Sequence, residues 1–150
     1  MIINKEWLDR WNACKEAQEW WAGHNETDAL TVIEMLIKDE YLDWANWGVA
    51  RLLDDDGKRA YAIYAAEQVL EIFEAKYPED DRPRKAIEAA KAYLKDKTPE
   101  NKNAAYAAAY AAYAAADAAH AAAHAAHAAA KKEMKLRILK YGMKLMKEGE

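Results

Sequence analysis

The chain has 150 residues, of which 53% are hydrophobic and 32% charged, and its formal net charge is −4. This length suits one domain with a sizeable core, and the single cysteine, Cys14, excludes an internal disulfide and fits a reducing compartment. We find no secretory signal pattern and no apolar run of the ~20 residues that a transmembrane helix needs. The sequence therefore predicts a cytoplasmic protein.

The charge is distributed unevenly along the chain. Residues 1–100 carry 14 Lys and Arg against 22 Asp and Glu, a net charge of −8, whereas residues 101–150 carry eight against four, a net charge of +4. Two interpretations follow: the basic C-terminal third docks on its own acidic body, or these surfaces meet a charged partner. The acidic total argues against nucleic acid or a membrane as the partner.

Helical periodicity extends over nearly the whole chain and strand patterns are missing, so we expect an all-α fold. Asn4 is predicted to cap a first helix that runs to Gly23, and Thr27 a second. A third helix is expected to stop at the acidic loop Asp54-Asp55-Asp56, where Gly57 takes the position after the helix. The first helix carries its large side chains and Cys14, expected as a buried apolar group, in one stripe: Trp7, Trp11, Cys14, Gln18 and Trp21.

A fourth helix is predicted from about Lys58 to Lys76, and a fifth from Pro83. Their expected inner faces are Tyr61, Ala65, Gln68, Val69, Ile72 and Phe73 on the fourth, and Ala86, Ile87, Ala90 and Leu94 on the fifth. The clearest helix start is Thr98-Pro99-Glu100, which combines a capping residue, a proline at the first position and an acid in the first turn. A helix from there to Lys147 would span about 73 Å, more than a compact domain of this length. We therefore expect a break near residues 129–133 and six or seven helices in all.

The segment from Ala104 to Ala130 has an unusual composition, with 20 alanines among 27 residues. The other seven follow a 4-3 spacing that puts them in one stripe: Tyr106, Tyr110, Tyr113, Asp117, His120, His124 and His127. Alanine has the highest helix propensity, and its small side chain lets other helices approach closely. We expect a compact bundle around this helix, as one domain over residues 1–150. Its parts are acidic aromatic-rich helices (1–97), the central alanine-rich helix (98–130) and a basic amphipathic C-terminal helix (131–150) with Met134, Ile138, Tyr141 and Leu145 on one side.

The stripe is a candidate binding site for a small molecule or a metal ion. His120 and His124 lie four residues apart, so this pair is a candidate for chelating a transition metal from one helix face. A polar seam that is hydrogen-bonded to other helices explains the same residues without a ligand. No cofactor is predicted. Because the sequence has no Gly-rich phosphate loop, no Ser/His/Asp order and no paired CxxC, we predict no catalytic site.

Candidate contacts for a protein partner come from aromatic and acidic residues. Six tryptophans fall within residues 7–47, and they either pack in the core or form a binding surface. Trp20 and Trp21 project about 100° apart, so one of them is expected to be exposed. Two acidic loops are either solvated turns or contacts to a basic partner. The candidate contact residues are Trp20, Asp54, Asp55, Asp56, Asp80 and Asp81. Arg82 and Arg84 are expected to pair with Asp80, Asp81 or helix ends.

The stretch from Tyr61 to Leu94, YAIYAAEQVLEIFEAKYPEDDRPRKAIEAAKAYL, resembles the immunity-5-like family of helical immunity proteins. The block YPEDDRPRKAIEAA with the following Ala/His-rich helix carries this resemblance, and the earlier LDWANWGVARLLD is similar as well, so it covers about residues 40–130. The resemblance implies neutralisation of a toxin, in a polymorphic toxin system, by stoichiometric binding without catalytic residues. Similar sequences in phage genomes leave an antagonist of host defence as the alternative. Homo-oligomerisation stays open.

Overall fold

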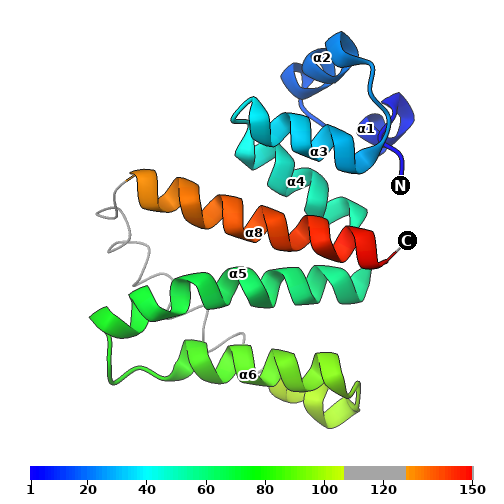
Figure 1. The fold of residues 1–150 in the computed structure, drawn as a ribbon. Coiled ribbons are helices and arrows are strands. Elements are labelled where there is room, and N and C mark those ends of the chain that lie inside the picture. Colours follow the sequence, from blue (N-terminus) through cyan, green and yellow to red (C-terminus); the bar gives the residue numbers. More distant parts are fainter. Residues whose placement is uncertain (107–127, 150) are drawn as a thin grey trace. The chain divides into compact units, whose positions relative to one another are not determined.

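The computed structural model describes residues 1–106 and 128–149, and these are almost entirely helical (Figure 1). The helices with defined bounds are α1 (Lys5–Arg10), α2 (Lys15–His24), α3 (Ala29–Lys38), α4 (Leu42–Leu52), α5 (Asp55–Lys76), α6 (Arg82–Lys95) and α8 (Ala128–Glu148). Residues 99–106 are helical as well. The all-α prediction is confirmed, whereas the predicted central position of the alanine-rich helix falls on residues 107–127, outside the described residues. No helix of the described ranges is both long and apolar enough to cross a bilayer.

The chain divides into two compact units, which we describe separately. The first comprises Met1–Gly57 together with Leu139–Glu150, and the second comprises Lys58–Ile138.

The first unit begins with two short helices where the sequence predicts one. The side chain of Asn4 caps α1 as predicted, because its Oδ1 accepts a hydrogen bond from the backbone N–H of Trp7 at 2.8 Å. However, α1 ends at Arg10, and Asn12 adopts a left-handed conformation with φ of 51°. Asparagine tolerates this conformation better than most residues. The break leaves Cys14 exposed, so its predicted burial is wrong.

The next two helix boundaries also differ from the predicted ones. Helix α2 passes through Gly23 and ends at His24. The capping residue Asn25 is left-handed with φ of 53° and donates its backbone N–H to the carbonyl of Trp21 at 2.9 Å. Helix α3 is capped by Asp28 and not by Thr27, because an aspartate oxygen accepts the backbone N–H of Thr31 at 2.9 Å.

The residues before α1 pair with the residues that follow α2. The N–H of Ile3 donates to the carbonyl of Thr27 at 2.9 Å, and the N–H of Ala29 donates to the carbonyl of Met1 at 3.1 Å. This antiparallel pairing centres on the bridge between Ile2 and Asp28. It therefore ties the first residues of the chain to the start of α3.

The cap of α3 makes the stability of the first unit depend on pH. The backbone N–H and the hydroxyl of Thr31 both donate to Asp28, which lowers the pKa of that carboxyl from its usual 3.8. A lowered pKa in the folded state stabilises the fold above the unfolded value, and this contribution is lost as the pH falls through the folded value. We expect Asp28→Ala to lower the Tm at pH 7. We further expect the difference from wild type to narrow below pH 3.8 in thermal unfolding followed by circular dichroism. A constant difference down to pH 2 would contradict a cap that needs the charged carboxylate.

The core of the first unit is aliphatic. Ile33 of α3 and Val49 of α4 are both 0% exposed, and α3 and α4 pack against one another (Figure 1). Gly48 marks their close approach, since a Cβ at this position would lie 2.8 Å from the Cδ1 of Ile33. None of the six tryptophans is fully buried. Aliphatic residues, and not the tryptophans, therefore form the core of the first unit.

The C-terminal half of α8 belongs to the first unit and buries one face. The buried positions are Leu139, Gly142 and Met146, at the helical spacing of three and four residues. The predicted face was Met134, Ile138, Tyr141 and Leu145, all of which are only half-buried. Helix α8 is amphipathic as predicted, but each buried position lies one residue after the predicted one.

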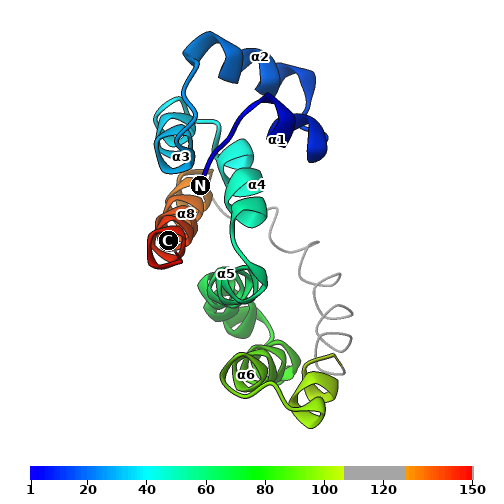
Figure 2. The same ribbon diagram turned by 90° about the vertical axis from the view of Figure 1, so that its right-hand side faces the viewer.

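In the second unit, α5 and α6 form an antiparallel pair, side by side in both views (Figures 1 and 2). The inner face predicted for α6 is confirmed at three of its four residues, because Ile87, Ala90 and Leu94 pack with residues of α5. The face predicted for α5 is wrong in part: Val69 is 46% exposed and Ile72 is 51% exposed. The residues that α5 contributes are Ile63, Ala66 and Leu70. An ion pair between Lys91 and Glu67 also joins the two helices.

The helix start at Thr98-Pro99-Glu100 is confirmed. The hydroxyl of Thr98 accepts the backbone N–H of Asn101 at 3.2 Å, and residues 99–106 are helical. The break expected near residues 129–133 is not there, because α8 runs without interruption from Ala128 to Glu148.

Candidate partner-binding surfaces

Most of the Tyr/Asp/His stripe lies outside the described residues. This applies to Tyr110, Tyr113, Asp117, His120, His124 and His127. Tyr106 is described, and its side chain is 60% exposed. Within residues 1–106 and 128–149, no three His, Cys, Asp or Glu side chains come together as metal ligands. A ligand or metal site on the stripe remains a prediction, which calorimetric titration with Zn²⁺ and Ni²⁺ can check.

The acidic residues Asp54, Asp55 and Asp56 follow α4 as predicted, but they start the next helix and do not form a loop. Helix α4 ends at Leu52, and the Oδ1 of Asp54 accepts the backbone N–H of Gly57 at 2.7 Å, which caps α5. Gly57 therefore lies in the first turn of α5, and its predicted position after the third helix is wrong. A Cβ on Gly57 would lie 3.0 Å from Asp54 Oδ1 and 3.1 Å from Leu53 Cδ2, so glycine leaves room for this cap. Asp55 and Asp56 occupy the first turn, where the helix dipole favours negative charge.

Substitutions at Asp54 separate capping from partner binding. Asparagine caps helices about as well as aspartate, whereas loss of the cap costs roughly 1 kcal/mol. We expect Asp54→Ala to lose about 1 kcal/mol of unfolding free energy and Asp54→Asn to stay close to wild type in urea denaturation. Because Asp54→Asn removes only the charge, any effect of this variant on partner binding reports an electrostatic contact. Equal stability losses in both variants would rule out the capping role.

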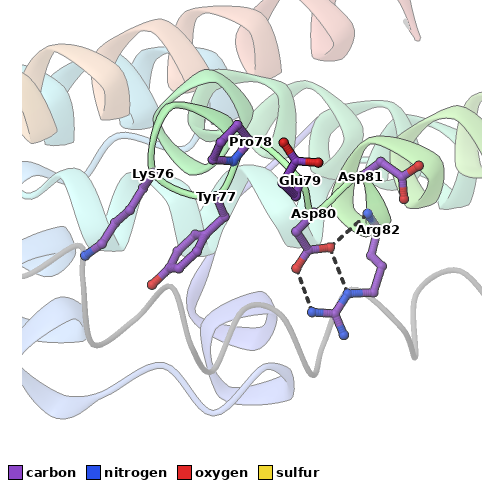
Figure 3. Close-up of a pocket in the computed structure, with 7 residues that line it drawn as sticks. All are labelled: Lys76, Tyr77, Pro78, Glu79, Asp80, Asp81 and Arg82. Carbon is purple, nitrogen blue, oxygen red and sulfur yellow. Dashed lines mark hydrogen bonds and ion pairs between the residues drawn. The ribbon is translucent and has the colours of Figure 1, made fainter.

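The second acidic loop forms a corner between α5 and α6 that is held by ion pairs (Figure 3). Arg82 donates to Asp80 in a bidentate arrangement, with Nε–Oδ1 at 2.8 Å and Nη2–Oδ2 at 2.6 Å. Arg84 donates to both carboxylate oxygens of Glu74 on α5, at 2.7 and 2.6 Å. These arginine hydrogen bonds lower the pKa of Asp80 and of Glu74. The expected pairing of Arg82 with Asp80 is confirmed, and both arginines fix this corner.

An open depression of about 610 Å³ lies on the same corner, lined by residues 76–82. Asp80 is engaged by Arg82 (Figure 3), and Asp81 pairs with Lys85 at 2.7 Å. Both carboxylates therefore already meet a cation of their own chain. Their predicted role as partner contacts remains a proposal.

The tryptophans of the first unit gather in two aromatic clusters. In the first, which we call the Arg51 cluster, the guanidinium carbon of Arg51 lies 4.0 Å from the ring centre of Trp47 and 5.7 Å from that of Trp11. Trp7 meets Trp47 edge to face at 5.5 Å. Arg51 Nη1 donates to the carbonyl of Trp47 at 3.1 Å, while its Nε is buried with no hydrogen-bond partner among the described residues. The ring faces thus provide much of the surroundings of this cation.

The second group, which we call the Trp20 cluster, comprises Trp20, His24, Tyr41 and Trp44. Tyr41 and Trp44 stack at 4.3 Å with planes 9° apart, and Trp20 meets Tyr41 at 6.2 Å with planes 69° apart. The ring of His24 lies 4.3 Å from that of Trp20. Tyr41 is 42% exposed, and Trp20 and Trp44 are half-buried. Trp20 was predicted as a partner contact, and the structure surrounds it with residues that the sequence did not single out.

Asp39 lies at the edge of the Trp20 cluster. Its Oδ2 accepts the indole N–H of Trp20 at 2.9 Å and lies 3.8 Å from the Nε2 of His24. The indole N–H of Trp21 donates instead to the carbonyl of Glu26 at 2.6 Å, and this bond fixes the turn after α2. Trp20 and Trp21 are both half-buried, so the expectation that one of them is exposed is wrong. Trp20 belongs to the Trp20 cluster, and Trp21 stabilises the fold.

A tight turn holds Tyr41 in place. The N–H of Tyr41 donates to the carbonyl of Leu36 at 2.8 Å, and the N–H of Glu40 donates to that of Ile37 at 3.2 Å, the pair of bonds of a Schellman motif. Glu40 is left-handed with φ of 65°. The motif ends α3 and sets Tyr41 directly before α4, so the exposed ring has a well-defined position.

Comparison with known families identifies most of the chain. The family model described as Imm-5 like putative immunity protein matches residues 53–150. Comparisons with curated proteins and with solved structures gave no match. The matched range contains the YPEDDRPRKAIEAA block and the Ala/His-rich segment that carry the resemblance in the sequence. The chain therefore belongs to the Imm-5 like family of immunity proteins.

Proposed function

We propose that the chain is a non-catalytic binding protein that neutralises a toxin or another protein partner by forming a stoichiometric complex. The observation that carries this proposal is the family match over residues 53–150. An immunity protein acts by occupying its target, so its function depends on surface residues and not on a reactive centre. The proposed contact residues are Trp20 and the acidic residues Asp54, Asp55, Asp56, Asp80 and Asp81.

Charge supports a basic partner. The first unit carries eight Lys and Arg against 15 Asp and Glu, a net charge of −7. A field of one sign speeds association with a partner of the opposite sign and disfavours like-charged proteins. We propose that the complex forms in the cytoplasm, where an exposed thiol such as that of Cys14 stays reduced.

Affinity capture from the native host tests this proposal. The full chain serves as bait, and an unrelated protein of similar net charge serves as the control bait. We expect one dominant protein in a 1:1 complex by native mass spectrometry, and we expect co-expression of the chain to protect cells from that protein. Repeated capture of nothing beyond the control, or a captured protein whose toxicity is unaffected by the chain, would count against the proposal.

A further inference from the structure

The two aromatic clusters of the first unit differ in how they meet a cation. In the Arg51 cluster the chain supplies its own guanidinium, stacked 4.0 Å from the centre of Trp47. In the Trp20 cluster the ionisable groups beside the rings are the carboxylate of Asp39 and the imidazole of His24, which lies 4.3 Å from the ring of Trp20. No Lys or Arg of residues 1–106 or 128–149 lies over the rings of Trp20, Tyr41 or Trp44. The second cluster thus has the aromatic faces of a cation site and an acid beside them.

We propose that the Trp20 cluster is the docking surface for an arginine side chain of a basic protein partner. This inference rests on the proposed function, and it names the chemical group that the partner presents to the chain. The guanidinium stacks on an exposed aromatic face, as Arg51 does within the chain, and pairs with the carboxylate of Asp39.

The geometry of Asp39 suits this role. Both of its contacts, with the indole N–H of Trp20 and with the ring of His24, use Oδ2. Oδ1 takes no part in these contacts, so it can accept a hydrogen bond from a guanidinium. Arginine suits such a surface better than lysine, because its planar guanidinium stacks on rings and is less strongly hydrated.

The surface is also ordered before the partner arrives. Tyr41 is fixed by the Schellman motif at the end of α3 and by stacking on Trp44. The ring of Trp20 is fixed by its hydrogen bond to Asp39. A preordered aromatic surface loses little conformational entropy on binding, which is a property of binding hot spots.

The position of this surface in the chain has a further implication. The family match begins at residue 53, whereas the Trp20 cluster is built from residues 20–44. The arginine-binding surface would then lie in the segment that the family model does not cover, whereas the proposed acidic contact residues lie inside the matched range.

A peptide titration of the full chain tests the inference directly. The probe is a nine-residue peptide in which arginine alternates with glycine, and its matched control replaces every arginine with citrulline, which keeps the shape and removes the charge. Binding is followed by the tryptophan indole N–H signals in ¹H–¹⁵N NMR spectra. We expect the arginine peptide to shift the Trp20 and Trp44 signals and to leave those of Trp7 and Trp47 in place.

Surface variants with matched controls give the quantitative result. We expect Tyr41→Ala to weaken binding of the arginine peptide about tenfold and Asp39→Asn to weaken it several-fold. The controls are Tyr93→Ala, which removes a half-buried ring of the second unit, and Glu6→Gln, which removes another exposed acid. Both controls are expected to bind within twofold of wild type. Circular dichroism and the Tm confirm that each variant is folded.

Several outcomes would overturn the inference. It fails if the citrulline peptide binds as tightly as the arginine peptide, or if Glu6→Gln weakens binding as much as Asp39→Asn, since the attraction would then be diffuse. It also fails if a toxin captured by the wild-type chain binds Tyr41→Ala and Asp39→Asn with unchanged affinity. That last result leaves the proposed function intact. Conversely, if the chain captures no partner but the arginine peptide binds at Trp20 as described, the proposed function fails and the cation site stands.

Discussion

The Ile33→Ala variant is expected to lose about 2–5 kcal/mol of unfolding free energy, the usual cost of truncating a fully buried aliphatic side chain. Ile33 is 0% exposed and lies where α3 packs on α4. Its removal costs the burial of three methyl or methylene groups and leaves a cavity that the packed neighbours fill only in part. Since domains are typically stable by only ~5–15 kcal/mol, this variant would lose a large share of its unfolding free energy. Urea denaturation followed by circular dichroism measures the loss.

The adjacent residue provides the control for this experiment. Glu34 projects about 100° away from Ile33 on α3 and is exposed, so Glu34→Ala should change the unfolding free energy by no more than about 0.5 kcal/mol. If Ile33→Ala loses less than about 1 kcal/mol, the packing of α3 on α4 does not hold the first unit together as described.

A double-mutant cycle between Gly48 and Ile33 is expected to show a strong coupling. In Gly48→Ala the added methyl group would meet the Cδ1 of Ile33 at 2.8 Å, and overpacking of this kind costs about 1–3 kcal/mol. The higher helix propensity of alanine offsets up to ~1 kcal/mol of this cost. Ile33→Val removes the same Cδ1 atom. We therefore expect the double variant to be more stable than the sum of the single changes by about 1 kcal/mol or more.

Gly23 is the matched control for the glycine substitution. It also lies within a helix, but a Cβ at this position has nothing within 4 Å. Gly23→Ala should therefore stabilise the protein by up to ~1 kcal/mol through helix propensity alone. Equal effects at Gly23 and Gly48, or additive effects in the cycle, would show that the close approach at Gly48 is absent in solution.

Helix ends were the part of the fold that the sequence predicted least well. Glycine is the usual signal for a helix end, and it led to predicted ends at Gly23 and Gly57. In the structure, the left-handed residues that follow the ends of α1, α2 and α3 are Asn12, Asn25 and Glu40. The backbone hydrogen bonds of these turns offset the cost of a left-handed conformation, and a sequence pattern does not reveal them. One such turn, at Asn12, divides the predicted first helix into two.

Core faces were predicted where the apolar residues were confined to one side of a helix. This holds for α6, whose charged residues leave a single stripe through Ile87, Ala90 and Leu94. In α5, alanine and larger apolar residues occur on every side, so periodicity does not select a face. The packing of α6 determines which face of α5 is buried. Ile63 and Leu70 are therefore buried, whereas Ile72 is exposed.

The candidate binding surface was predicted at one residue and missed at the others. Adjacency to Trp21 was enough to single out Trp20, because two neighbouring rings cannot share one helix face. Tyr41 and Trp44 were not singled out, because their spacing of three residues is compatible with a buried face as well as with an outward stack. Asp39 joins them from 19 residues beyond Trp20, and only the turn at the end of α3 brings it there.

The exposed thiol of Cys14 has a practical consequence for measuring how many chains form a complex. An accessible cysteine with no second cysteine in its own chain forms a disulfide with another copy when the reductant is removed and air oxidises the thiol. Preparations left to oxidise would then contain covalent dimers of the chain. A 1:1 complex would therefore be measured as an assembly of two chains and two partner molecules. Blocking this one sulfur, or attaching a single dye to it, yields a homogeneous sample with a label at the start of α2.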